Sequence, residues 1–244
     1  MDVSRSRLRE NLHFVFVRTQ FASNLGSAVR VVRNMGFEKV VLVRPACEVG
    51  VEARSFAMKG AELLDRSQFF PSLAEAASQL SALVGASGRF AGRKAPENLI
   101  NCRRFAESLL PDALSAPVGI VFGPEDNGLS SEELGQCQWL MEIPADPDYP
   151  TLNLAQAAAV AAYEANLALT EAKPEPFLHL ASPKENLLLL QRLEKLLRHA
   201  PLPGYLAPER LMHRFRRIFV RAQLEHEDAQ MLQGLMSILE DAKR

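Results

Sequence analysis

Cysteine is scarce in this 244-residue chain, and its three cysteines, Cys47, Cys102 and Cys137, lie far apart. An odd number of widely spaced cysteines favours reduced thiols in the cytoplasm over a disulfide framework. Histidine is also scarce, with five residues, and neither an H-x-x-x-H nor a C-x-x-C spacing occurs. We therefore expect a cytoplasmic protein with no disulfide framework and no metal site.

Long hydrophobic runs are absent as well. No uncharged apolar segment approaches the roughly 20 residues that a membrane-spanning helix needs. Residues 1–9 are basic, but no apolar stretch follows them, so we expect neither a secretory signal nor a membrane association. The net charge of −1 excludes a uniformly basic nucleic-acid binder. Arginines nevertheless concentrate in residues 5–9 and 210–221, and such local patches can bind phosphates.

Apolar and helical stretches alternate along most of the chain. Hydrophobic residues make up 48% of the sequence, which is enough for a packed core. Short apolar runs of strand length lie at residues 13–17, 40–43, 82–84, 118–122 and 140–143. Helical spacing appears at residues 24–35, 73–80 and 153–170. This alternation predicts an α/β fold, a parallel sheet flanked by helices on both faces.

The pattern changes near residue 172. Several prolines interrupt residues 172–183, which we interpret as a linker, and only helical spacing follows in residues 184–244. We therefore predict a main domain over residues 1–171 and a small helical C-terminal extension over residues 184–244.

Polar residues and turn formers cluster where predicted strands meet helices, in residues 24–30, 122–130 and 149–156. Ligands of open α/β sheets bind at the carboxyl ends of strands, so these segments favour an enzyme over a scaffold. Taken singly, each segment has a simpler interpretation. Asn24 and Asn153 can be helix N-caps, and Glu125 can stabilise its turn. A dinucleotide site is disfavoured, because residues 18–22 lack the glycine fingerprint.

The C-terminal extension carries four arginines at spacings of i, i+4, i+7 and i+11: Arg210, Arg214, Arg217 and Arg221. This spacing puts all four on one face of a helix, where an anionic partner would relieve their mutual repulsion. The alternative is a solvated face. We predict that this arginine stripe binds an anionic partner.

Three motifs, in this order, resemble the SpoU/TrmH branch of the SPOUT RNA methyltransferases. The branch pattern N-x-G-x-x-x-R matches residues 24–30, and F-G-x-E-x-x-G-L matches residues 122–129. A proline and, after a short spacer, the motif S-L-N-L-A match residues 144–155, with Thr151 in place of serine. The resemblance covers about residues 10–170, and the helical extension is most similar to TrmJ-type tRNA methyltransferases.

The resemblance implies a deep trefoil knot in the sheet, a homodimer, S-adenosyl-L-methionine as cofactor and RNA as partner. It implies 2'-O-methylation of a ribose, with tRNA and its anticodon loop as the expected substrate. An rRNA methyltransferase of the same fold and a non-catalytic RNA-binding protein are the alternatives.

The resemblance also implies site residues. The catalytic set is Asn24, Arg30, Glu125, Thr151 and Asn153. The cofactor-binding set is Ala86, Ser87, Gly88, Gly123, Ile143, Pro150, Thr151 and Leu152. The family assigns an arginine the role of general base. Arg30 can fill that role, or its charged guanidinium can stabilise the developing alkoxide.

Overall fold

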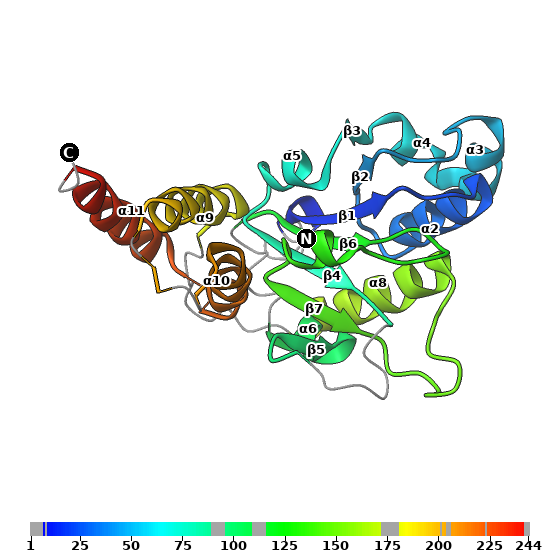
Figure 1. Ribbon diagram of the computed structural model, residues 1–244. Helices are drawn as coiled ribbons and strands as arrows, with labels where there is room; N and C mark the ends of the chain where they lie inside the picture. The colour runs from blue at the N-terminus through cyan, green and yellow to red at the C-terminus, as the bar shows by residue number, and fades with distance from the viewer. Residues whose placement is uncertain are drawn as a thin grey trace.

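The protein is described by a computed structural model that covers residues 7, 9–88, 96–108, 116–171, 181–200, 202–203, 206–222 and 224–241. Figure 1 shows a layered α/β body with a group of helices at one end. No helix in these ranges combines the length and the apolar character needed to cross a membrane.

Seven strands form a single sheet. They are β1 Leu12–Val17, β2 Lys39–Val43, β3 Gln68–Phe70, β4 Ala82–Ala86, β5 Leu99–Asn101, β6 Val118–Phe122 and β7 Trp139–Glu142. The order is β3-β2-β1-β6-β4-β7-β5, and every recorded pairing is parallel. The predicted parallel sheet is thus confirmed, and the carboxyl ends of all its strands lie at one edge.

Helices cover both faces of the sheet, as expected. They are α2 Ala22–Asn34, α3 Val51–Ala57, α4 Ala61–Asp65, α5 Leu73–Ala77, α6 Cys102–Ser108, α7 Ser131–Leu134 and α8 Leu154–Glu171, with a 3-10 turn at Met58–Gly60. Alternate residues of β1 enter two different cores: Phe14 and Phe16 pack with α2 and α8, whereas Val15 and Val17 pack with α5. Successive side chains of a strand point to opposite faces, which explains the division.

Three further helices form the C-terminal extension: α9 Pro183–Arg198, α10 Pro208–Ala222 and α11 His226–Asp241. Their small core contains Ala181, Leu189, Ala229 and Met236. Figure 1 places the extension beside the amino ends of the strands. Accordingly, α9 contacts α5, and Arg221 of α10 bonds Glu97, two residues before β5. Residues 172–180 of the predicted linker lie outside the described residues, and the domain division stays a prediction.

Several elements differ from the sequence expectation. The strands β3 and β5 were not expected, because three residues are too short for a periodic signal. The helix expected over residues 73–80 ends at Ala77. The strand order is compatible with the knot that the resemblance implies, and the knot remains a prediction.

Candidate active site

The predicted site segments all follow the carboxyl ends of neighbouring strands. Asn24 lies beyond β1, Glu125 beyond β6, residues 87–88 beyond β4, and residues 143–153 beyond β7. Since these four strands are adjacent in the order β1-β6-β4-β7, their loops meet at a single edge of the sheet. The expected convergence of distant segments is therefore present.

Asn24, Glu125 and Asn153 form one hydrogen-bonded unit, which we term the amide–carboxylate network. The Asn24 side-chain amide donates to Oε1 of Glu125 at 2.9 Å, and the Asn153 side-chain amide donates to Oδ1 of Asn24 at 2.9 Å. The backbone N–H of Gln20 donates to Oε2 of Glu125, also at 2.9 Å. Both oxygens of the carboxylate thus accept hydrogen bonds, and residues 20–24 are joined to two segments that lie more than 100 residues further along the chain.

The N-cap interpretation of Asn24 is wrong. Helix α2 begins at Ala22, and Phe21 occupies the cap position without a side-chain hydrogen bond. Asn24 lies inside the first turn, so its amide is available to Glu125. Asn153, by contrast, does cap its helix, because its Oδ1 accepts from the backbone N–H of Ala155 at 2.8 Å. Its remaining amide group still reaches Asn24, so Asn153 serves both purposes.

The loop that carries Glu125 is held in place by its own backbone and by the helix that follows. Gly128 has a φ of +62°, and its N–H donates to the carbonyl of Pro124 at 2.9 Å. A Cβ on Gly123 would collide with the backbone of Gly128 and Leu129, so only glycine fits there. Ser130 and Glu133 form a capping box at the start of α7.

Sequence reasoning missed Arg18, which follows β1 and pairs with Glu133 through both guanidinium nitrogens. Burial alone would raise the pKa of Glu133, but the hydrogen bonds from Arg18 and Ser130 outweigh it and lower that pKa. Arg18 also has a φ of +49°. The ion pair therefore ties the end of β1 to the loop that follows β6. A lone arginine after a strand gives no sequence signal for such a pairing.

The expected cofactor segments approach one another closely. The N–H of Ser87 donates to the carbonyl of Met141 at 2.9 Å. A Cβ on Gly88 would lie 2.9 Å from the carbonyl oxygen of Pro150, so a side chain there would press on that backbone. Ala86 and Ile143 pack partly against the core, whereas Thr151 and Leu152 are exposed. The segments after β4 and β7 therefore meet through their backbones.

Arg30 stands apart from this arrangement. It is exposed on α2, and its Cα faces Gly60, where an added Cβ would come within 3.2 Å. Within the part of the chain that the structure describes, no hydrogen bond or ion pair joins Arg30 to the amide–carboxylate network. The structure thus joins three of the five predicted catalytic residues by hydrogen bonds, and Thr151 lies two residues before Asn153 in the sequence.

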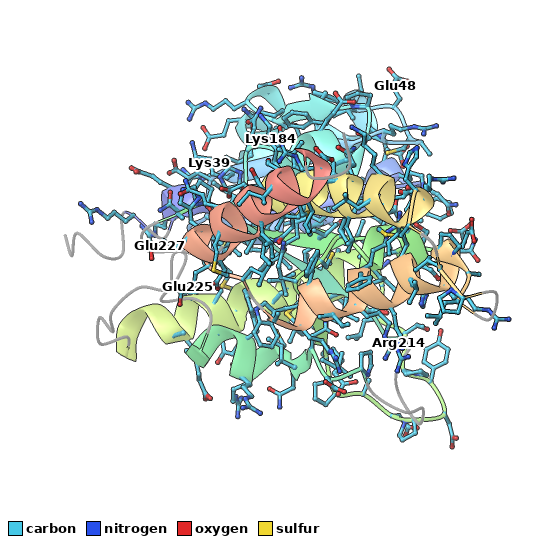
Figure 2. All side chains as sticks on the ribbon, turned by 60° about the vertical axis from the view of Figure 1, so that its left-hand side comes forward. Lys39, Glu48, Lys184, Arg214, Glu225 and Glu227 are labelled. Carbon is cyan, nitrogen blue, oxygen red and sulfur yellow. The ribbon has the colours of Figure 1, made fainter. Side chains whose placement is uncertain are left out.

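The arginine stripe lies on α10, at the other end of the sheet. All four arginines are exposed, and Figure 2 shows Arg214 on the side of α10 that faces away from α9 and α11. Arg221 is partly engaged, because its guanidinium donates to Glu97 at 2.6 Å. Among the described residues, the other three have no recorded ion pair.

Comparison with known proteins places this arrangement in a family. Residues 11–163 match the model of the SpoU rRNA Methylase family. A curated relative, "tRNA (cytidine/uridine-2'-O-)-methyltransferase TrmJ" of Pectobacterium atrosepticum, is 32% identical over 93% of this chain and 96% of its own length.

Solved structures agree. The crystal structure of TrmJ from Z. mobilis ZM4 gives a TM-score of 0.79 at 24% identity, covering 93% of this chain and 98% of that one. A probable methylase family protein from Haemophilus influenzae Rd KW20 gives 0.62 at 28% identity, covering 95% and 97%. The predicted relationship is confirmed: the chain belongs to the SpoU methylase family.

Proposed function

We propose that this protein is an S-adenosyl-L-methionine-dependent tRNA 2'-O-ribose methyltransferase that acts on cytidine or uridine in the anticodon loop. The amide–carboxylate network carries the proposal, because it joins the three motif segments of the family in one place. The TrmJ relatives are named as cytidine/uridine methyltransferases, and a structural neighbour is titled for methylation of C/U34 on tRNA.

The segments after β4, β6 and β7 fit the cofactor. A neighbour with a TM-score of 0.51 and 20% identity, the SpoU methyltransferase AviRb, was solved with AdoMet. In this chain, the lack of a side chain at Gly88 lets the backbone of Pro150 and Thr151 lie against the segment after β4, so the expected cofactor segments stand side by side. When bound, the cofactor supplies an electrophilic methyl group on a sulfonium. The residues that would hold it are Ser87, Gly88, Pro150 and Thr151. The trefoil knot that the family resemblance implies is part of the same proposal.

The chain's own residues must orient the ribose and help its 2'-hydroxyl proton to leave. Arg30 is the proposed residue for this work. It acts either as the base or, with its guanidinium charged, by stabilising the alkoxide and gripping the adjacent phosphate. The amide–carboxylate network fixes the loops between which the ribose lies. Thr151 adds a hydroxyl beside the cofactor segments.

A homodimer would complete this site. Helices α2 and α8 pack against each other, and α8 also exposes Tyr163 and Leu167 at 48% and 41%. A partner docked on these helices would cover this apolar surface and bring a second Arg30 to the interface. The expected result is a dimer by light scattering at micromolar concentration, and a monomer would contradict this assembly.

The arginine stripe is the proposed RNA contact of the extension. Its three arginines without a recorded ion pair in the described chain remain able to bind phosphates. A tRNA substrate and reduced cysteines both support a cytoplasmic location.

Methylation of unmodified RNA, followed by mass-spectrometric mapping, tests the proposed function. The purified protein with cofactor should methylate a pyrimidine ribose in the anticodon loop of tRNA. Because the family model is named for rRNA, ribosomal RNA belongs in the same assay. Methylation of rRNA alone would favour the related rRNA enzyme, and no methylation with intact RNA binding would favour a non-catalytic binder.

A further inference from the structure

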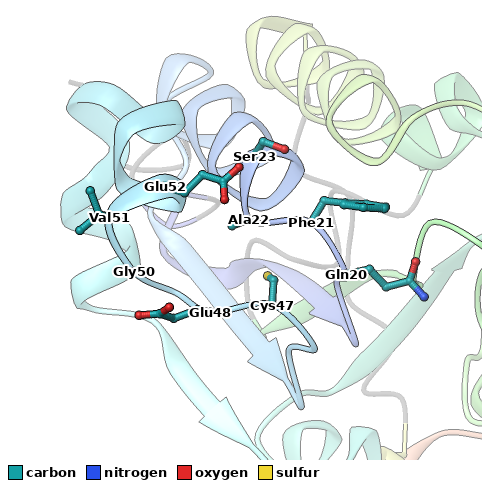
Figure 3. Close-up of a pocket in the computed structure, with 9 residues that line it drawn as sticks. All are labelled: Gln20, Phe21, Ala22, Ser23, Cys47, Glu48, Gly50, Val51 and Glu52. Carbon is teal, nitrogen blue, oxygen red and sulfur yellow. The ribbon is translucent and has the colours of Figure 1, made fainter.

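A pocket of about 220 Å³ opens beside the amide–carboxylate network (Figure 3). It lies between the loop after β1 and the loop after β2. Its lining residues are Gln20, Phe21, Ala22, Ser23, Cys47, Glu48, Gly50, Val51 and Glu52. For comparison, a cavity of about 150 Å³ in another protein holds a benzene ring. A single planar ring therefore fits this volume.

The position of the pocket relates it to the reacting ribose. Along the carboxyl edge of the sheet, the pocket lies at β2 and β1, the amide–carboxylate network at β1 and β6, and the cofactor segments at β6, β4 and β7. Gln20 belongs to both the pocket and the amide–carboxylate network, because it lines the pocket and its backbone N–H donates to Glu125. A nucleotide whose ribose lies at the network therefore has the pocket on one side and the methyl donor on the other.

The lining favours an uncharged aromatic ring over a phosphate. Phe21 is 56% exposed, and its ring offers a face for stacking. Figure 3 shows Cys47 and the carboxylate of Glu52 pointing toward the start of α2. Burial raises the pKa of Cys47, and the charges of Glu125 and Glu52 raise it further, so its thiol stays neutral. Carboxylates repel phosphate but accept hydrogen bonds from the N–H groups of a base.

We propose that this pocket holds the pyrimidine base of the nucleotide whose ribose is methylated, and that the base stacks on the ring of Phe21. The proposal rests on the proposed function, because it needs an RNA substrate. It assigns Phe21 to substrate binding, a role that lies outside the three family motifs. Since Phe21 precedes Asn24 by one helical turn, stacking there would also set the ribose against the network.

The test compares two substrates and three proteins. One substrate is the tRNA methylated by the wild-type protein, and the other carries an abasic ribose, with its 2'-hydroxyl intact, at the mapped position. The proteins are wild type, Phe21→Ala and Phe69→Ala. Phe69 on β3 is a matched control, because it is 57% exposed and does not line the pocket.

On intact tRNA, Phe21→Ala should lower kcat/KM by about 5- to 150-fold, the range expected for a lost base–aromatic stack. Phe69→Ala should match wild type. On the abasic tRNA, wild type and Phe21→Ala should react at the same reduced rate, because there is no base to stack. Phe21→Leu, which keeps an apolar side chain, should behave like Phe21→Ala and replaces it if the alanine variant does not fold.

The outcomes separate the two proposals. If wild type methylates no intact tRNA, the proposed function fails. If wild type is active but the Phe21 variants lose no more than Phe69→Ala, the pocket does not hold the base. An equal loss on intact and abasic tRNA would also overturn the proposal, because it would show that Phe21 acts only on the protein's own structure.

Discussion

At the scale of single residues, Asn24 lies at the centre of the amide–carboxylate network, because its side chain both donates and accepts a hydrogen bond. Its amide nitrogen donates to Glu125, and its carbonyl oxygen accepts from Asn153. Only an amide side chain of this length can do both. The sequence predicted the two partners as site residues, but only the motif resemblance brought them together, since no local pattern pairs residues 129 apart.

Asn24→Asp should lower the rate of methyl transfer without unfolding the protein. The new carboxylate would replace a donor to Glu125 with a like charge, and a lost buried hydrogen bond costs about 1–3 kcal/mol. We expect methyl transfer to fall by about 5- to 150-fold, the same energy expressed as a rate ratio. Asn34→Asp, exposed at the end of the same helix, should retain the wild-type rate. Full activity of Asn24→Asp would show that the hydrogen bond from Asn24 to Glu125 is not needed for methyl transfer.

Arg30→Ala should abolish methyl transfer and leave cofactor affinity unchanged, because Arg30 lies outside the segments after β4, β6 and β7. Calorimetry of cofactor binding and the methylation rate measure the two effects separately. Arg33→Ala is the control, since Arg33 is also exposed on α2 but pairs with Glu62. Substantial residual turnover in a folded Arg30→Ala protein would show that this arginine is dispensable.

At the scale of elements, strand β1 does more than carry the site at its end. His13 lies on β1 opposite Lys39 of β2. Burial lowers the pKa of His13 to about 4, and the charge of Lys39 contributes to the shift. The folded chain therefore resists protonation of this imidazole.

Acidification should consequently destabilise the fold through His13. In the unfolded chain His13 regains its ordinary pKa of 6.5, so the unfolded state binds the proton first. His13 therefore leaves the free energy of unfolding unaffected by pH above 6.5, and lowers it progressively as the pH falls from 6.5 toward 4. His13→Gln should reduce the pH dependence of the urea unfolding midpoint, whereas His213→Gln, exposed on α10, should not. If the unfolding midpoints of wild type and His13→Gln depend identically on pH, His13 is not a cause of the acid destabilisation.

The accuracy of the sequence analysis also varied by element. Long elements with a clear period were predicted within one or two residues, as for β6 and α8. The short strands β3 and β5 were missed, because they are defined by pairing with neighbours and not by their own pattern. The start of α2 was placed two residues late, because Asn24 looked like a cap.

At the scale of the whole molecule, the site and the arginine stripe lie at opposite ends of the sheet. The network is at the carboxyl edge, and the extension adjoins the amino ends of the strands (Figure 1). A tRNA that touches both must therefore extend along the body or reach the site of a partner subunit. If the stripe binds RNA as proposed, it contributes to affinity and not to the chemical step.

Replacing Arg210, Arg214 and Arg217 by glutamine should raise KM for tRNA and leave kcat nearly unchanged. Each lost phosphate contact should flatten the log–log salt dependence of binding by about 0.7–0.9. Replacing Arg192 by glutamine is a control for the loss of one arginine charge elsewhere in the extension, because Arg192 bonds Gln233 and Ser237. An unchanged KM and salt slope in the triple variant would leave the stripe as a solvated face.

The long sequence separations within the amide–carboxylate network have a kinetic consequence. Its bonds span 101, 105 and 129 residues, so no part of the site exists until strands from both halves of the main domain have paired. Folds dominated by such distant contacts form slowly, because loop closure precedes any gain from the contact. Catalytic competence should therefore be among the last properties to return during refolding. The fluorescence of the single tryptophan, Trp139 on β7, provides a reference signal for that order of events.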